Sequence, residues 1–114
     1  MTRKAYVKVT NLDELRESYV TFFELAGRPV IVTRTQGSIQ AFDGMCTHAD
    51  FQFATSRLSA ACEIECPMHG ACFDAVSGEV THGPAELPLE RLDLKVENGV
   101  VCICVDWANV SETI

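Results

Sequence analysis

Residues 91–105 read RLDLKVENGVVCICV, and this stretch decides the fold class. From 91 to 97 apolar and polar residues alternate, a period of two that places the apolar side chains on one face of a strand. Asn98-Gly99 follows, and this dipeptide between two such runs is the strongest short-range signal of a β-hairpin. The second run, 100–105, is apolar throughout. The sequence therefore predicts an antiparallel hairpin near the C-terminal end.

Short strand patterns also fill the first part of the chain. Runs rich in β-branched and aromatic residues predict strands; they lie at 5–9, 19–25, 30–34 and 39–42. Gly27 and Gly37 mark turns, so the last three of these runs form a meander. Asn11-Leu12-Asp13-Glu14 resembles a capping box, which predicts one short helical turn through Leu15. The prediction is an all-β, antiparallel fold.

Length and charge limit the domain count and the partners. The chain has 114 residues and a mass of 12.5 kDa, which suits one hydrophobic core, so we expect residues 1–114 to form a single domain. A net charge of −7 argues against nucleic acid and anionic membranes as partners. No apolar run approaches the roughly 20 residues of a membrane helix. The basic start has no apolar segment after it, so a cytoplasmic location is expected.

The middle of the chain, 44–88, is poor in periodicity and rich in Cys, His, Gly and Pro. It contains Cys46-Thr47-His48 and, after seventeen residues, Cys66-Pro67-Met68-His69. Each pair supplies one thiolate and one imidazole, a donor set that can hold zinc or a [2Fe-2S] cluster. A zinc finger usually groups its two cysteines and its two histidines separately. Mixed pairs favour a cluster in which both cysteines bind one iron and both histidines bind the other.

The two pairs, Cys46-x-His48 and Cys66-Pro67-x-His69-Gly70, resemble the signature of Rieske iron–sulfur proteins. Further matches lie downstream at Phe73-Asp74, Ser77-Gly78-Glu79-Val80, Gly83-Pro84-Ala85 and Leu87-Pro88. In particular, the chain is similar to the Rieske-type ferredoxins of bacterial aromatic ring-hydroxylating dioxygenase systems. The resemblance implies an antiparallel β sandwich or barrel base with a small cluster-binding subdomain inserted at about 44–85. It also implies one [2Fe-2S] cluster per chain, held by Cys46, His48, Cys66 and His69.

Two missing features argue that the chain is a carrier and not a complete enzyme. A mononuclear iron site needs two histidines and a carboxylate, but only His82 remains after His48 and His69 are used. The chain also lacks the Gly-x-Gly-x-x-Gly fingerprint for a dinucleotide. We therefore expect a monomeric one-electron carrier between a flavin-containing ferredoxin reductase and a terminal oxygenase. A small subunit of another reductase, for example nitrite reductase, and a structural zinc module are the alternatives.

Four cysteines and one histidine remain outside this assignment. We expect Cys102 and Cys104 to pack in the core as small apolar residues, and Cys62 and Cys72 to be buried bystanders near the site. His82 is expected in a partly exposed loop. A rim around the histidine ligands would meet both electron-transfer partners; the residues expected there are Phe51, Gln52, Met68, Pro84 and Ala85.

Overall fold

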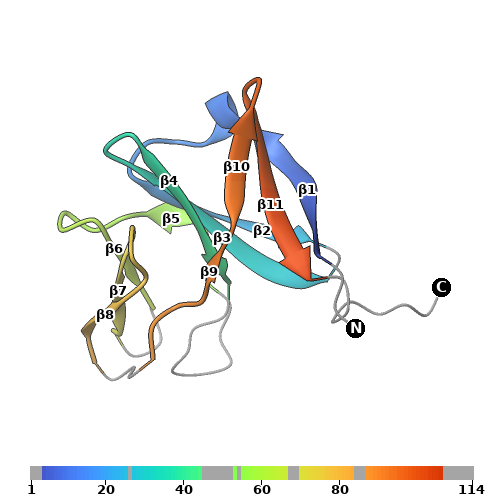
Figure 1. Cartoon of the computed structure of the whole chain (residues 1–114). Helices are drawn as coiled ribbons and strands as arrows, with labels where there is room; N and C mark the ends of the chain where they lie inside the picture. The colour runs from blue at the N-terminus through green and yellow to red at the C-terminus, as the bar shows by residue number, and fades with distance from the viewer. Residues whose placement is uncertain are drawn as a thin grey trace.

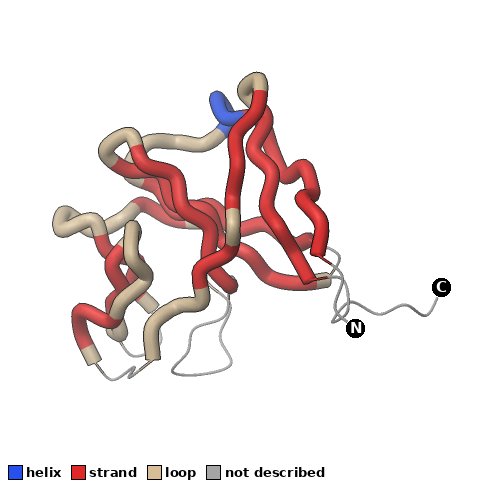
Figure 2. The backbone as a smooth tube through the Cα atoms, viewed as in Figure 1, coloured by secondary structure: helices blue, strands red, loops and turns tan. Residues whose placement is uncertain are grey.

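The structure is a computed structural model, and it describes residues 4–25, 27–44, 53, 55–66, 70–83 and 87–106. Strands and connecting loops make up nearly all of this part of the chain (Figures 1 and 2). The elements are β1 (Lys4–Asn11), η1 (Leu12–Glu14, a 3-10 turn), β2 (Tyr19–Leu25), β3 (Arg28–Thr35), β4 (Ser38–Asp43), β5 (Ser56–Arg57), β6 (Glu63–Glu65), β7 (Cys72–Asp74), β8 (Val80–His82), β9 (Arg91–Leu92), β10 (Leu94–Glu97) and β11 (Val100–Asp106).

The first sheet has three strands in the order β1-β11-β10. Its β10–β11 hairpin pairs Glu97 with Val100 and turns through Asn98 and Gly99, both at positive φ (53° and 76°). Positive φ at both central residues is what a tight hairpin turn with the right twist requires, and it explains the Asn-Gly pair. The predicted hairpin is confirmed for Leu94–Glu97 and Val100–Asp106, whereas Arg91–Leu92 forms a separate strand, β9, that pairs with β4 of another sheet. On the other side of β11, β1 adds a long-range antiparallel pairing across the whole chain.

The second sheet has five strands in the order β5-β2-β3-β4-β9. Its centre is the predicted meander of β2, β3 and β4, with all pairs antiparallel. The β3–β4 turn uses Gln36 and Gly37 at positive φ (53° and 77°). The two-residue strands β5 and β9 complete the edges of the sheet. Each strand pair that the structure describes is antiparallel, so the all-β antiparallel prediction is confirmed.

Strand β3 is buried on both faces and separates two hydrophobic cores. Val30 and Val32 point to one side, where they join Val101, Ile103 and other residues of the first sheet in the base core. Ile31 points to the opposite side, into a second cluster that includes residues of β6 and β7. Because side chains alternate along a strand, one strand can serve both cores. The base is thus a two-sheet sandwich, and the second core attaches the remaining strands to it.

The third sheet, in the order β6-β7-β8, lies against the outer side of the five-stranded sheet (Figure 1). The buried Thr33 hydroxyl donates to the carbonyl of Ala75 at 2.7 Å and joins β3 to the turn after β7. Gly78 (φ +81°) lies against Phe42 so closely that a Cβ atom would come within 2.8 Å of the ring. Among the described residues no helix is long and apolar enough to cross a membrane.

Candidate functional site

Cys66 stands at the end of β6 and is fully buried (0% exposed). Its backbone N–H donates to the carbonyl of Ala71 at 2.7 Å, and the N–H of Gly70 donates to the Cys66 carbonyl at 2.9 Å. Gly70 has φ +77°, a conformation that glycine adopts without strain. These bonds join the two ends of the segment 67–69 and fix the backbone of Cys66. Of the four predicted ligands, Cys46, His48 and His69 lie outside the described residues.

The ends of the other predicted ligand segment, 45–52, are held together as well. The N–H of Phe53 donates to the carbonyl of Gly44 at 2.9 Å, and Gly44 in turn donates to Pro29 at 2.9 Å. A Cβ on Gly44 would come within 2.8 Å of the Pro29 backbone, so only glycine allows this approach. The base of this segment is therefore fixed on strand β3.

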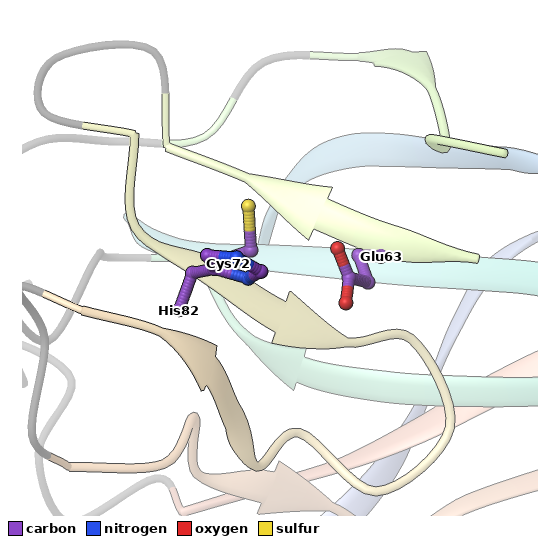
Figure 3. A group of neighbouring side chains, drawn as sticks. All are labelled: Glu63, Cys72 and His82. Carbon is purple, nitrogen blue, oxygen red and sulfur yellow. The ribbon is translucent and has the colours of Figure 1, made fainter. Parts of the chain in front are cut away.

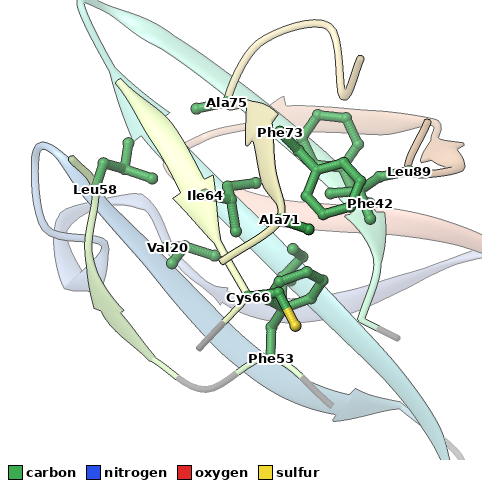
Figure 4. Close-up of a cluster of buried hydrophobic side chains, with 11 residues drawn as sticks. Val20, Phe42, Phe53, Leu58, Ile64, Cys66, Ala71, Phe73, Ala75 and Leu89 are labelled. Atoms are coloured by element: carbon green, nitrogen blue, oxygen red, sulfur yellow. The ribbon is translucent and has the colours of Figure 1, made fainter. Parts of the chain in front are cut away.

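Both segment bases stand on one buried cluster. Phe53 (3% exposed) meets Phe73 edge to face with ring centroids 6.0 Å apart, and Cys66 belongs to the same cluster. Figure 4 shows the Cys66 side chain beside Phe53, at one end of the cluster. Leu89 (3% exposed) joins it from the stretch before β9. Chain segments far apart in the sequence thus start from one rigid platform, which is the condition for a precise site on loops.

The turn after β7 is held by the carboxylate of Asp74. One of its oxygens accepts the backbone N–H of Val76 at 2.8 Å and that of Ser77 at 2.9 Å. The backbone of Asp74 also bonds Glu79 and Gly78, at 2.8 Å each. Bonds from Ser77 and Val76 lower the pKa of Asp74 below its ordinary value. Asx turns have this geometry: the side chain of an aspartate accepts hydrogen bonds from backbone N–H groups a few residues later. This explains an aspartate at this position.

Asp74→Asn tests this turn through its pH dependence. The amide keeps the shape but loses the charge that strengthens both bonds, so we expect a loss of about 1 kcal/mol in unfolding free energy at neutral pH. Since the folded-state pKa is lowered, the carboxylate stabilises the fold above its unfolded-state pKa, and this contribution disappears as the pH falls through the folded-state pKa. Urea titrations at several pH values should therefore show the two proteins converging in acid. Asp93→Asn, an exposed carboxylate between β9 and β10, is the control; a gap for Asp74→Asn that persists in acid would contradict the assignment.

The remaining cysteines do not lie where the sequence suggested. Cys102 and Cys104 are half-buried on the outer face of the first sheet, because the alternation of β11 turns Val101, Ile103 and Val105 into the core. The core-packing prediction for these two is wrong. Cys62 and Cys72 are also half-buried and not fully buried; the Cys62 sulfur lies 3.4 Å from the Thr35 hydroxyl.

His82 is exposed, as expected, but it lies in strand β8 and not in a loop. Burial raises the pKa of the neighbouring Cys72 thiol, and the carboxylates of Glu63 and Glu65 raise it further.

The expected docking rim lies outside the described residues. Its members are Phe51, Gln52, Met68, Pro84 and Ala85.

Comparison with known proteins identifies this arrangement. The family model described as "Rieske [2Fe-2S] domain" matches residues 5–104. The chain belongs to the Rieske [2Fe-2S] domain family. A curated relative from Ralstonia sp, the ferredoxin component of naphthalene 1,2-dioxygenase/salicylate 5-hydroxylase systems, is 28% identical over 93 residues, which are 82% of this chain and 88% of the relative.

Two solved structures share the fold of this chain. The ferredoxin of carbazole 1,9a-dioxygenase from Nocardioides aromaticivorans IC177 is 32% identical with a TM-score of 0.77, covering 87% of this chain and 96% of the ferredoxin. A chain from the complex of reduced oxygenase and oxidized ferredoxin in carbazole 1,9a-dioxygenase is 25% identical with a TM-score of 0.77, covering 86% of this chain and 91% of that one.

A Rieske domain binds a [2Fe-2S] cluster, and the described residues fit one. The Cys66 thiol is a soft donor of the kind that iron in such clusters takes, and it is fully buried in the same cluster as Phe53. Its apolar surroundings include Phe53 and Phe73, which exclude water from that end of the platform. Exclusion of water from the surroundings of the thiolate is one of the features by which a protein sets the redox potential of a cluster.

Proposed function

We propose that this chain is the ferredoxin component of an oxygenase system, a one-electron carrier that is not itself an enzyme. The observation that carries the proposal is the extent of the match: the relative that is named as a ferredoxin component aligns over 88% of its own length, and the carbazole 1,9a-dioxygenase ferredoxin over 96% of its length. The residues of this chain that align therefore correspond to a carrier module, without a catalytic domain in the aligned length.

The proposed ligands are the thiolates of Cys46 and Cys66 on one iron and the imidazoles of His48 and His69 on the other. Cys66 supports this assignment because it is buried in the cluster that also holds Phe53, at the end of segment 45–52. That segment contains Cys46 and His48, and segment 67–69 contains His69. When bound, the cluster supplies reversible transfer of one electron. The protein's part is to hold four donors and to keep water from the thiolate side, which the platform under Cys66 does. We keep 44–85 as the proposed bounds of the cluster-binding subdomain.

The proposed partners are a flavin-containing ferredoxin reductase, which supplies the electron, and a terminal oxygenase that hydroxylates an aromatic ring. Support for the oxygenase comes from the solved oxygenase–ferredoxin complex of carbazole 1,9a-dioxygenase, whose matching chain has the fold of this one. A carrier that serves two proteins in turn needs a small, short-lived interface. We propose that it acts as a monomer in the cytoplasm, where a reducing environment would keep the described thiols reduced.

Metal and sulfide analysis of the purified protein tests the proposal. Protein expressed with ample iron should be brown and should contain about two irons and about two acid-labile sulfides per chain. Stoichiometric zinc without sulfide would favour a structural zinc module and contradict the assignment. In a reconstituted assay, the iron-loaded chain should be required for electron flow from a ferredoxin reductase to an oxygenase.

A further inference from the structure

The outer face of the β6-β7-β8 sheet brings together a carboxylate, a thiol and an imidazole. Glu63 of β6, Cys72 of β7 and His82 of β8 place their ligand atoms within 4.8 Å of one another (Figure 3). None of these residues belongs to the proposed cluster ligands. The group therefore needs its own explanation.

Two features of the sheet produce this convergence. In β6 and β7, Ile64 (1% exposed) and Phe73 (0% exposed) point into the core, so their neighbours Glu63 and Cys72 point to the outer face. In a regular strand, side chains two positions apart point to the same face. Without an irregularity in β8, His82 would therefore lie on the same face as Val80.

A β-bulge in β8 changes that alternation. Phe73 pairs with Val80, and Cys72 pairs with His82, so Thr81 is an extra residue on the β8 side. Val80 packs against the buried cluster, whereas His82 is exposed beside Cys72. Bulges redirect side chains in this way and are common next to functional sites. The bulge is what adds the imidazole to the group.

The charges around the three donors favour a cation. Glu65 lies directly opposite Cys72 in the β6–β7 register, on the same outer face as Glu63. In the part of the chain that the structure describes, neither carboxylate forms an ion pair with Lys or Arg. Among the described residues, the Cys72 sulfur makes only a long contact, 3.5 Å, with the carbonyl of Gly70. The site is thus rich in negative charge and is not neutralised within these residues.

We propose that Glu63, Cys72 and His82 form a second metal site, separate from the cluster, for a divalent transition metal of the zinc class. Thiolate sulfur, imidazole nitrogen and carboxylate oxygen are the three donor types that zinc takes, and three protein ligands leave a fourth position for water. The strands fix the three backbones, so small side-chain rotations bring the donors onto one ion. Binding replaces the proton of the Cys72 thiol, which is released to the buffer.

Zinc binding to the iron-loaded protein tests the site. After equilibration with Zn²⁺ and dialysis, we expect one zinc per chain in addition to the iron, with the visible absorption of the cluster unchanged. Cys72→Ala and His82→Ala should each weaken zinc binding by at least about tenfold, since even the loss of an outer-shell partner costs about that much. Cys62→Ala is the matched control, a half-buried thiol beyond this group, and should bind zinc like the parent.

Alkylation provides a second readout that needs no variant. Treatment of the iron-loaded protein with N-ethylmaleimide, followed by peptide mass mapping, should show Zn²⁺ slowing modification of Cys72 but not of Cys62. Equal protection of both cysteines would overturn the proposal, and so would equal zinc binding by Cys72→Ala. Loss of cluster absorption on adding zinc would place the ion on the cluster ligands and would also overturn it.

Discussion

Cys66→Ala is expected to abolish cluster binding, with iron and sulfide falling from about two each per chain to near zero. The backbone N–H and carbonyl of Cys66 make the bonds to Ala71 and Gly70, and a substitution at the side chain leaves both in place. The variant should therefore fold with its segment ends still fixed and lack only the donor. His48→Ala and His69→Ala should have the same effect, because water cannot replace an imidazole donor. Iron, sulfide and visible absorption are the measurements.

Cysteines on the other side of the molecule provide the controls. Cys102 and Cys104 lie on the outer face of the first sheet. The inner face of this sheet packs in the base core and not in the cluster around Cys66. Cys102→Ala and Cys104→Ala should keep the parent's iron content and spectrum. A Cys66 variant that retained its iron, or a Cys102 variant that lost it, would show that the ligand assignment is wrong.

The strands that the sequence predicted are those whose signals are local. The alternation of 91–97 and the Asn98-Gly99 turn specify the β10–β11 hairpin within fifteen residues, and the meander of β2 to β4 is equally local. The pairing of β1 with β11 could not be predicted in this way, because the paired residues lie 89 (Asn11 and Val100) to 102 (Lys4 and Asp106) positions apart in the chain. Strands β5 to β8 were also missed, since two or three residues carry too little periodicity to stand out.

The predicted ligands and the group around Cys72 also differ in whether their signal is local in the sequence. The Cys-x-His and Cys-x-x-His spacings are visible in the sequence because each pair lies on one segment. Cys72 and His82 come together only through a cross-strand register and one extra residue in β8, and no sequence pattern displays a bulge of that kind. The alternation in Glu63-Ile64-Glu65 and Cys72-Phe73-Asp74 was the available signal: it separates inward from outward residues once both runs are taken as strands.

Phe73→Ala is expected to have the second largest effect, on the stability of the platform under the site. Phe73 is fully buried, contacts Phe53 at the base of segment 45–52, and pairs with Ile64 and Val80 on the neighbouring strands. Removing a buried phenyl ring leaves a cavity and costs about 3–5 kcal/mol. For a domain of ordinary stability, about 5–15 kcal/mol, this is a large share of the unfolding free energy. Urea denaturation of the iron-loaded protein measures the loss.

A comparison with Ile103→Ala separates a local effect from a global one. Ile103 is just as fully buried but lies in the base core, on the far side of β3 from Phe73. Both variants should lose several kcal/mol of unfolding free energy, about 2–5 kcal/mol for the isoleucine. Only Phe73→Ala removes the contact between β7 and Phe53 at the end of segment 45–52. Under native conditions, this variant alone should therefore release iron to a chelator faster than the parent. Local opening can occur well below the cost of global unfolding. Equal rates of iron release from the two variants would mean that the cluster is lost only when the whole domain unfolds, and that the buried ring is not a specific support of the site.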